Sequence, residues 1–254
     1  MKICVVTDNY FLYDTMLEII NENNYGCDFV FFCSKMNKPS PLKGIIPDIR
    51  LKDKDLSFFK SYDLFLSLHC KQLFPDELVN TVRCVNVHPG LNPYNRGWFP
   101  QVFAIMNKLP HGATIHEIDN KLDHGAIIVQ ERVEIHSWST SYSVYTEVQN
   151  AEARLLKANL SDIISNNYKR KIPDIEGNIN YLKDFKALCE INLEETITWA
   201  EAIDRLRALS FRGYKNAFFY DKDGEKIYLS LDLDKGKVGG AKFEVASKEW
   251  RAAS

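Results

Sequence analysis

The chain has 254 residues, of which 45% are hydrophobic, and a formal net charge of −2. This length suits one full domain with a small appendage. The balanced charge excludes the broad basic surface that holds a nucleic-acid backbone, so no nucleic-acid partner is expected. The sequence contains neither a signal-peptide pattern nor the roughly 18 consecutive apolar residues of a membrane span. We therefore expect a cytoplasmic protein without a membrane partner.

The six cysteines are scattered and form no Cys-x-x-Cys pair. Several lie in apolar runs, so we expect reduced core residues of a cytoplasmic chain rather than a disulfide framework. No spacing of histidines and cysteines fits a zinc site, and no metal is expected.

The first part of the chain alternates short apolar runs with helical patterns. Strands are predicted over residues 2–6, 28–33, 63–68 and 84–88, and helices over 11–20, 56–62 and 75–82. Strands of this kind indicate a Rossmann-like α/β fold with a mostly parallel sheet covered on both faces. The turn Thr7-Asp8-Asn9-Tyr10 takes the place of a glycine-rich turn, which argues against a dinucleotide site.

The remaining elements divide the chain into three parts. Further along we predict a helix over 100–107, a β pair over 112–118 and 126–135, a helix over 141–164, a capped helix over 198–209, a hairpin of 218–220 with 226–233, and a strand over 241–246. Residues 166–195 are polar and poorly periodic, which is typical of a linker. We expect a main domain over 1–165, this linker, and a small β-rich C-terminal subdomain over 196–254.

Three side chains offer the chemistry of acyl transfer. Asn86 and His88 are two residues apart at the end of a predicted strand, so both point to the same face. Pro89 removes a backbone donor and ends the strand, where open α/β sheets bind ligands. Asp123 adds a carboxylate. Together they could supply an oxyanion donor, a proton acceptor and a group that orients it.

Each of these residues also has a simpler interpretation. A strand-end asparagine often bonds a loop, a lone histidine is often a satisfied core residue, and an aspartate near a glycine often forms a turn. His88 could accept a proton or, as a cation, stabilise an oxyanion, and the sequence leaves both roles open. His69, His116 and His124 are further candidates for contacts in the site.

Three ordered motifs resemble the formyltransferases that use N10-formyltetrahydrofolate. They are the run 86–101, which begins Asn-Val-His-Pro-Gly, the run 112–116, Gly-Ala-Thr-Ile-His, and the run 122–128, Leu-Asp-His-Gly-Ala-Ile-Ile. This family includes glycinamide ribonucleotide, methionyl-tRNA and nucleotide-sugar formyltransferases. Gly90 and the run 95–100, Asn-Arg-Gly-Trp-Phe-Pro, look most like the sugar branch, which formylates dTDP-linked amino-dideoxy sugars. The resemblance covers residues 1–165 well and 195–235 weakly.

The resemblance implies a complete set of roles. Asn86, His88 and Asp123 would be catalytic, and a folate pocket would lie between the loops 70–74 and 118–123. We expect the folate co-substrate to meet five residues, which are Lys71, Leu73, Phe74, Asp119 and Leu122. The amino-sugar nucleotide would meet Arg96, Gly97, Trp98 and Tyr214, with Arg96 on the pyrophosphate. Core packing is the simpler interpretation of Leu73, Phe74, Trp98 and Phe99.

The family also implies a reaction and its alternatives. The expected reaction transfers a formyl group to dTDP-4-amino-4,6-dideoxy-D-glucose for O-antigen or another cell-surface polysaccharide, in a homodimer. The 3-amino isomer is the second choice. A purine precursor or initiator tRNA is an alternative acceptor, but the tail after residue 195 is too long for the first enzyme and too short and uncharged for the second. An inactive nucleotide-binding module on the same fold is the remaining alternative.

Overall fold

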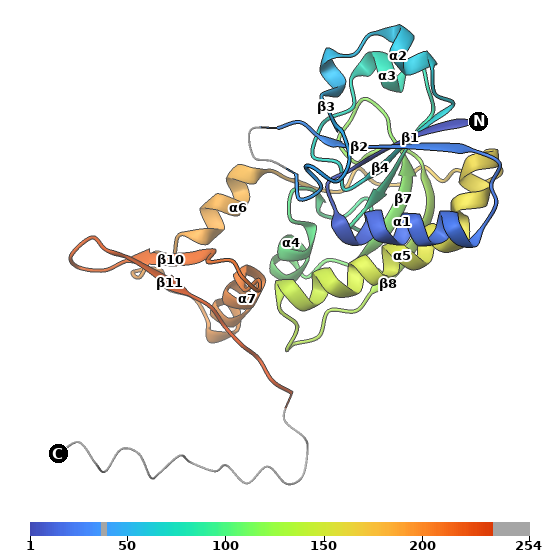
Figure 1. The fold of residues 1–254 in the computed structure, drawn as a ribbon. Coiled ribbons are helices and arrows are strands. Elements are labelled where there is room, and N and C mark those ends of the chain that lie inside the picture. The colour runs from blue at the N-terminus through green and yellow to red at the C-terminus, as the bar shows by residue number, and fades with distance from the viewer. Residues whose placement is uncertain (37–39, 236–254) are drawn as a thin grey trace.

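A seven-stranded sheet forms the centre of the molecule (Figure 1), in a computed structural model that describes residues 1–36 and 40–235. Its strand order is β3-β2-β1-β4-β5-β7-β8. The strands are β1 (Lys2–Thr7), β2 (Asp28–Ser34), β3 (Asp48–Ile49), β4 (Leu64–Leu68), β5 (Cys84–His88), β7 (His111–Glu117) and β8 (Ile127–Val133). The strands from β3 to β5 are parallel, and β7 and β8 are antiparallel to their neighbours. The predicted mostly parallel sheet is confirmed.

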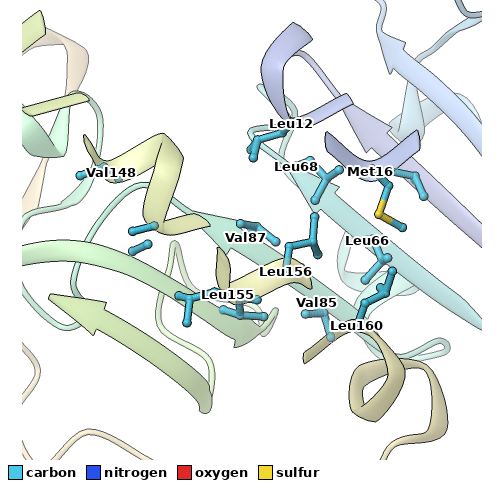
Figure 2. Close-up of a cluster of buried hydrophobic side chains, with 14 of the residues drawn as sticks. Leu12, Met16, Leu66, Leu68, Val85, Val87, Val148, Leu155, Leu156 and Leu160 are labelled. Carbon is cyan, nitrogen blue, oxygen red and sulfur yellow. The ribbon is translucent and has the colours of Figure 1, made fainter. Parts of the chain in front are cut away.

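Helices cover both faces of this sheet. They are α1 (Tyr10–Glu22), α2 (Leu56–Lys60), α3 (Asp76–Val79), α4 (Pro100–Asn107) and α5 (Ser141–Ser165), with a 3-10 turn η1 (Leu51–Asp53). Figure 1 shows α1 and α5 side by side along one face, with α2 and α3 away from them. The main core lies under α1 and α5, where Leu12 and Met16 meet Leu156 and Leu160 over β4 and β5 (Figure 2). Leucine and β-branched side chains on both layers exclude water there.

The C-terminal elements lie to one side of the sheet (Figure 1). They are α6 (Leu182–Cys189), α7 (Trp199–Leu209) and the antiparallel hairpin of β10 (Ala217–Tyr220) with β11 (Lys226–Leu229). The Thr198 side chain accepts from the Glu201 backbone N–H and starts α7, as the sequence predicted. The strand predicted over 241–246 lies outside the described residues.

The predicted linker needs correction. Residues 166–195 contain α6 and the short strand β9 (Ile179–Asn180), which pairs in parallel with β6 (Arg96–Gly97). A two-residue strand is too short to show periodicity in the sequence. Helix α6 packs only a narrow apolar stripe, which includes Phe185 and Cys189, against the core. The segment is therefore ordered and packed on the main domain. Of the helices in the described ranges, none is long and apolar enough to cross a membrane.

Candidate active site

Two neighbouring strands bring the polar side chains together. Asn86 on β5 pairs with His116 on the antiparallel strand β7, and His88 pairs with Thr114. Residues paired in register have side chains on the same face, so all four lie on one surface of the sheet. The loop that joins β7 to β8 carries Asp123 to these side chains. The prediction that Asn86 and His88 share a face at the end of a strand is confirmed.

Asp123 is the centre of the cluster. Its Oδ1 lies 3.4 Å from Asn86 Nδ2, 3.6 Å from His88 Nδ1 and 3.9 Å from His116 Nε2. Its Oδ2 accepts from the backbone N–H of Gly97 at 3.1 Å. The Asp123 backbone is left-handed, with φ of 46°, and its carbonyl oxygen accepts from Asn92 Nδ2 at 2.9 Å. This strained backbone at a polar site is held from several directions.

His116 fixes the orientation of the Asn86 amide. Its Nδ1 lies 2.7 Å from the carbonyl oxygen of Glu117, which can only accept, so Nδ1 carries the proton. Its Nε2 therefore accepts from Asn86 Nδ2 at 3.2 Å. The NH2 group of Asn86 thus points into the cluster, and its Asp123 contact is the longer of the two. Sequence reasoning named His116 only as a further candidate; the structure places it directly behind Asn86.

His88 is a buried, neutral imidazole. Burial lowers its pKa to about 4, and Asp123 opposes this shift only in part. Because Nδ1 faces the Asp123 carboxylate, we infer that Nδ1 carries the proton and that Nε2 holds a lone pair. Nε2 is buried without a hydrogen-bond partner among the described residues. A Cβ on residue 90 would collide with this nitrogen, so Gly90 makes room for the ring. The cationic role that the sequence left open does not fit such a group at neutral pH.

A second polar cluster adjoins the first at the ends of β1 and β4. His69 Nε2 lies 2.7 Å from Glu152 Oε1, and its Nδ1 lies 2.9 Å from Asn9 Nδ2. Glu152 is completely buried, and burial raises its pKa. The hydroxyl of Tyr145 also contacts Asn9, at 3.0 Å. The sequence offered His69 as a weak candidate and gave no signal for Glu152, since a lone glutamate in a helix is usually solvated.

The loops predicted to bind folate differ in exposure. Leu73 is 76% exposed and Lys71 is exposed, so both are accessible, whereas Phe74 packs edge-on against Phe65 in the core. Core packing was the simpler interpretation of Phe74, and the structure favours it. Asp119 and Leu122 lie in the loop that carries Asp123. The Asp119 carboxylate is 2.7 Å from His124 Nδ1. Folate binding at these residues remains a prediction.

Arg96 is buried and already paired within the protein. The residue is 1% exposed, and its guanidinium donates to the Leu122 carbonyl oxygen at 3.3 Å and to Glu176 Oε1 at 3.1 Å. The sequence could not show this, because Glu176 lies 80 residues away. The guanidinium therefore has a structural role as well, and the pyrophosphate contact of Arg96 remains a prediction. Trp98 is 41% exposed next to Gly97 and stays accessible to a substrate.

Tyr214 follows α7 and lies 61% exposed. Its ring meets Phe211, with 5.6 Å between centroids, and Phe211 in turn meets Tyr145 at 5.5 Å. The C-terminal region thus reaches the cluster of His69 and Glu152, and Tyr214 is open to solvent beside it. A substrate contact by Tyr214 remains a prediction.

Comparisons with known proteins agree with this site. Residues 58–160 match the family model described as formyl transferase, and residues 184–235 match the N-formyltransferase dimerization C-terminal domain. A dTDP-4-amino-4,6-dideoxyglucose formyltransferase from Mycobacterium tuberculosis H37Rv is 40% identical over 241 residues, which cover 95% of this chain and 100% of the relative. This chain belongs to the sugar N-formyltransferase family. The three ordered motifs therefore led to the correct family.

Solved structures of sugar N-formyltransferases have the same fold. One from Shewanella sp. FDAARGOS_354 superposes with a TM-score of 0.90 at 42% identity, covering 93% of this chain and 99% of the other. A sugar 3N-formyltransferase crystallised in the presence of dTDP and 5-N-formyl-THF is more distant, with a TM-score of 0.66, 25% identity, and coverage of 85% and 82%. The formyltransferase fold and class of this enzyme are thereby shown.

The site also depends on residues that the motifs did not indicate. Thr114 donates to the Gly90 carbonyl oxygen at 2.6 Å and accepts from the Asn92 N–H at 3.0 Å, so it holds the loop that follows His88. Gln130 on β8 donates to the Asn92 carbonyl oxygen at 2.7 Å. Thr114 lies two residues before His116 on the same strand, and that spacing was the available signal.

Proposed function

We propose that this enzyme transfers the formyl group of N10-formyltetrahydrofolate to the amine of a dTDP-amino-dideoxyhexose, with dTDP-4-amino-4,6-dideoxy-D-glucose as the first choice. The observation that carries this is the convergence of Asn86 and His88 on Asp123 Oδ1, at 3.4 and 3.6 Å, over one face of the sheet. The relative from M. tuberculosis supports the choice of sugar, and the 3N-formyltransferase crystallised with dTDP and 5-N-formyl-THF supports both ligand classes.

The geometry supports the following steps. The sugar amine attacks the formyl carbon, the new C–N bond forms, the bond from that carbon to N10 breaks, and N10 gains the proton that the amine loses. The Asn86 NH2 group would donate to the developing oxyanion, replacing its long contact with Asp123. The His88 Nε2 lone pair would accept the amine proton, a step that requires the bound substrate to reach a nitrogen buried beside Gly90. Asp123 would hold the imidazole through Nδ1.

The proposal also includes the oligomeric state, the compartment and the use of the product. The match of residues 184–235 to a dimerization domain supports a homodimer. A cytoplasmic enzyme that supplies a formylated sugar for an O-antigen or a related cell-surface polysaccharide fits both proposed substrates. The three-residue site requires neither a nucleophilic serine or cysteine nor a covalent intermediate.

The test is an assay with purified protein and N10-formyltetrahydrofolate. dTDP-4-amino, dTDP-3-amino and UDP-4-amino sugars are supplied separately, and the product mass is read, with His88→Ala as the inactive control. A gain of one formyl group, fastest on the dTDP-4-amino sugar, supports the proposal. Faster transfer to the 3-amino isomer would move the specificity to the second choice. Turnover only on glycinamide ribonucleotide or methionyl-tRNA, or none on any amine, would refute the sugar assignment.

A further inference from the structure

Residues 172–180 lie against the loop that carries Asp123, and neither family match includes them. We call this segment the strap. Its strand β9 pairs with β6, so that the Arg96 N–H donates to Asn178 O at 3.0 Å and the Trp98 N–H to Asn180 O at 2.9 Å. Together with Asn92, Arg96 and Asp123, the strap lines a cavity of about 300 Å³. The segment is thus a wall of the site.

The first link from the strap to Asp123 passes through Gly97. The Gly97 N–H donates to Asp123 Oδ2 at 3.1 Å. Gly97 has a φ of 91°, which favours glycine, and a Cβ there would lie 2.5 Å from the Asn180 carbonyl oxygen. The close approach of the strap therefore fixes the peptide that aims this N–H at the carboxylate.

The second link passes through Arg96. Its guanidinium bonds the carbonyl oxygen of Leu122, directly before Asp123, and its charge is buried. A buried cation needs a partner, and Glu176 of the strap provides one at 3.1 Å. Glu176 also lies 3.6 Å from His124, directly after Asp123. The strap thus reaches His124 directly on one side of the carboxylate, and Leu122 through Arg96 on the other.

We propose that the strap is a positioning element for the Asp123 carboxylate, with Arg96, Glu176 and Gly177 as positioning residues of formyl transfer. This rests on the proposed function of Asp123. Gly177 is the point at which the strap can be displaced. It has a φ of 72°, and a Cβ there would overlap the Pro93 carbonyl oxygen. An alanine at 177 must push the strap away from the loop that it holds.

The test compares Gly177→Ala with Gly26→Ala. Gly26 has a φ of 60° and open space around its Cβ position, so it matches the backbone strain without the collision. Gly177→Ala should lower kcat about tenfold or more while both KM values stay within about twofold. Gly26→Ala should change neither. In an Asp123→Asn background, Gly177→Ala should have no further effect on the residual kcat, because the carboxylate that it displaces is absent.

A second pair of variants tests the proposal with substitutions that should leave the fold intact. Glu176→Gln removes the charge opposite Arg96 at a side chain that is 64% exposed, and Glu22→Gln removes an exposed ion pair with Lys157. We expect about a threefold or larger loss of kcat from the first and none from the second, with equal melting temperatures. If Asp123→Asn is impaired while Gly177→Ala and Glu176→Gln keep wild-type kcat, or change KM alone, the strap proposal is overturned and the proposed function stands. Wild-type kcat in Asp123→Asn would overturn both.

Discussion

At the scale of single residues, the protonation state of His88 follows from where it is buried. Its pKa is lowered to about 4 by burial, while the Asp123 carboxylate, 3.6 Å away, favours the protonated form. The imidazole is therefore available as a proton acceptor throughout the neutral range. The arrangement keeps a lone pair inside the protein, where water cannot compete for it.

Asp123→Asn tests this interpretation directly. The substitution removes the charge that favours the imidazolium, so the His88 pKa should fall further, and turnover should fall about 100-fold. An NMR titration of the His88 ring proton and a steady-state assay measure the two effects. Asp76→Asn, at an exposed position in α3, is the control and should alter neither. A His88 pKa that rises, or turnover near the wild-type rate, would reduce Asp123 to a turn-forming residue.

The sequence predicted the three catalytic candidates because their signals are local. Asn86 and His88 are two positions apart on a strand, and Asp123 belongs to a recognisable run. It could not predict the true partner of Arg96, because Glu176 lies 80 residues further along. Glu152 was missed for the same reason: its partner His69 is 83 residues away, and only the fold brings them together.

At the scale of elements, prolines and a helix cap mark several boundaries that the sequence predicts correctly. Predicted and observed bounds agree for β5 and α4, where prolines at 89 and 100 mark an end and a start. The capped helix α7 begins within one residue of its prediction. The strand β9 was not predicted, because it exists only through its pairing with β6.

The Thr198→Ala variant tests how much the α7 cap contributes. The threonine side chain accepts from the Glu201 N–H, and the Glu201 carboxylate accepts from the Thr198 N–H. Loss of this capping box should lower the free energy of unfolding by about 1 kcal/mol without changing kcat. Urea unfolding and a steady-state assay measure these. Thr196→Ala is the matched control, since Thr196 is an exposed threonine two residues earlier. Equal losses from both variants would contradict the assigned cap.

At the scale of the whole molecule, three buried histidines make stability depend on pH. Burial lowers the pKa of His88 to about 4 and that of His111 to about 3, and it lowers the pKa of His116 as well. In the unfolded chain these histidines are protonated as the pH falls through about 6.5, whereas in the folded protein they are protonated only at lower pH. Their contribution to stability is therefore fully present above about pH 6.5 and is lost as the pH falls toward 4.

His111→Leu should make the protein less sensitive to acid. Each such histidine adds up to about 1.4 kcal/mol per pH unit to the slope of the unfolding free energy against pH in this window. In the variant, that slope should be smaller by up to this amount. Urea unfolding at pH 7, 6 and 5 gives the slope. Ile115→Val, on the same strand, should lower stability at every pH and leave the slope unchanged. An unaltered slope in His111→Leu would mean that His111 takes up its proton in the folded state.

The pairing of β6 with β9 limits where this enzyme can be divided or recombined. A fragment that stops at the end of α5, Ser165, contains Asn86, His88 and Asp123 but lacks the strand that β6 requires. A chimera joined at that helix end would exchange the partner of Arg96 together with the C-terminal region. Junctions placed after Tyr181, between β9 and α6, keep the native pairing intact. Chimeras between relatives should therefore fold and retain turnover at the later junction and lose it at the earlier one.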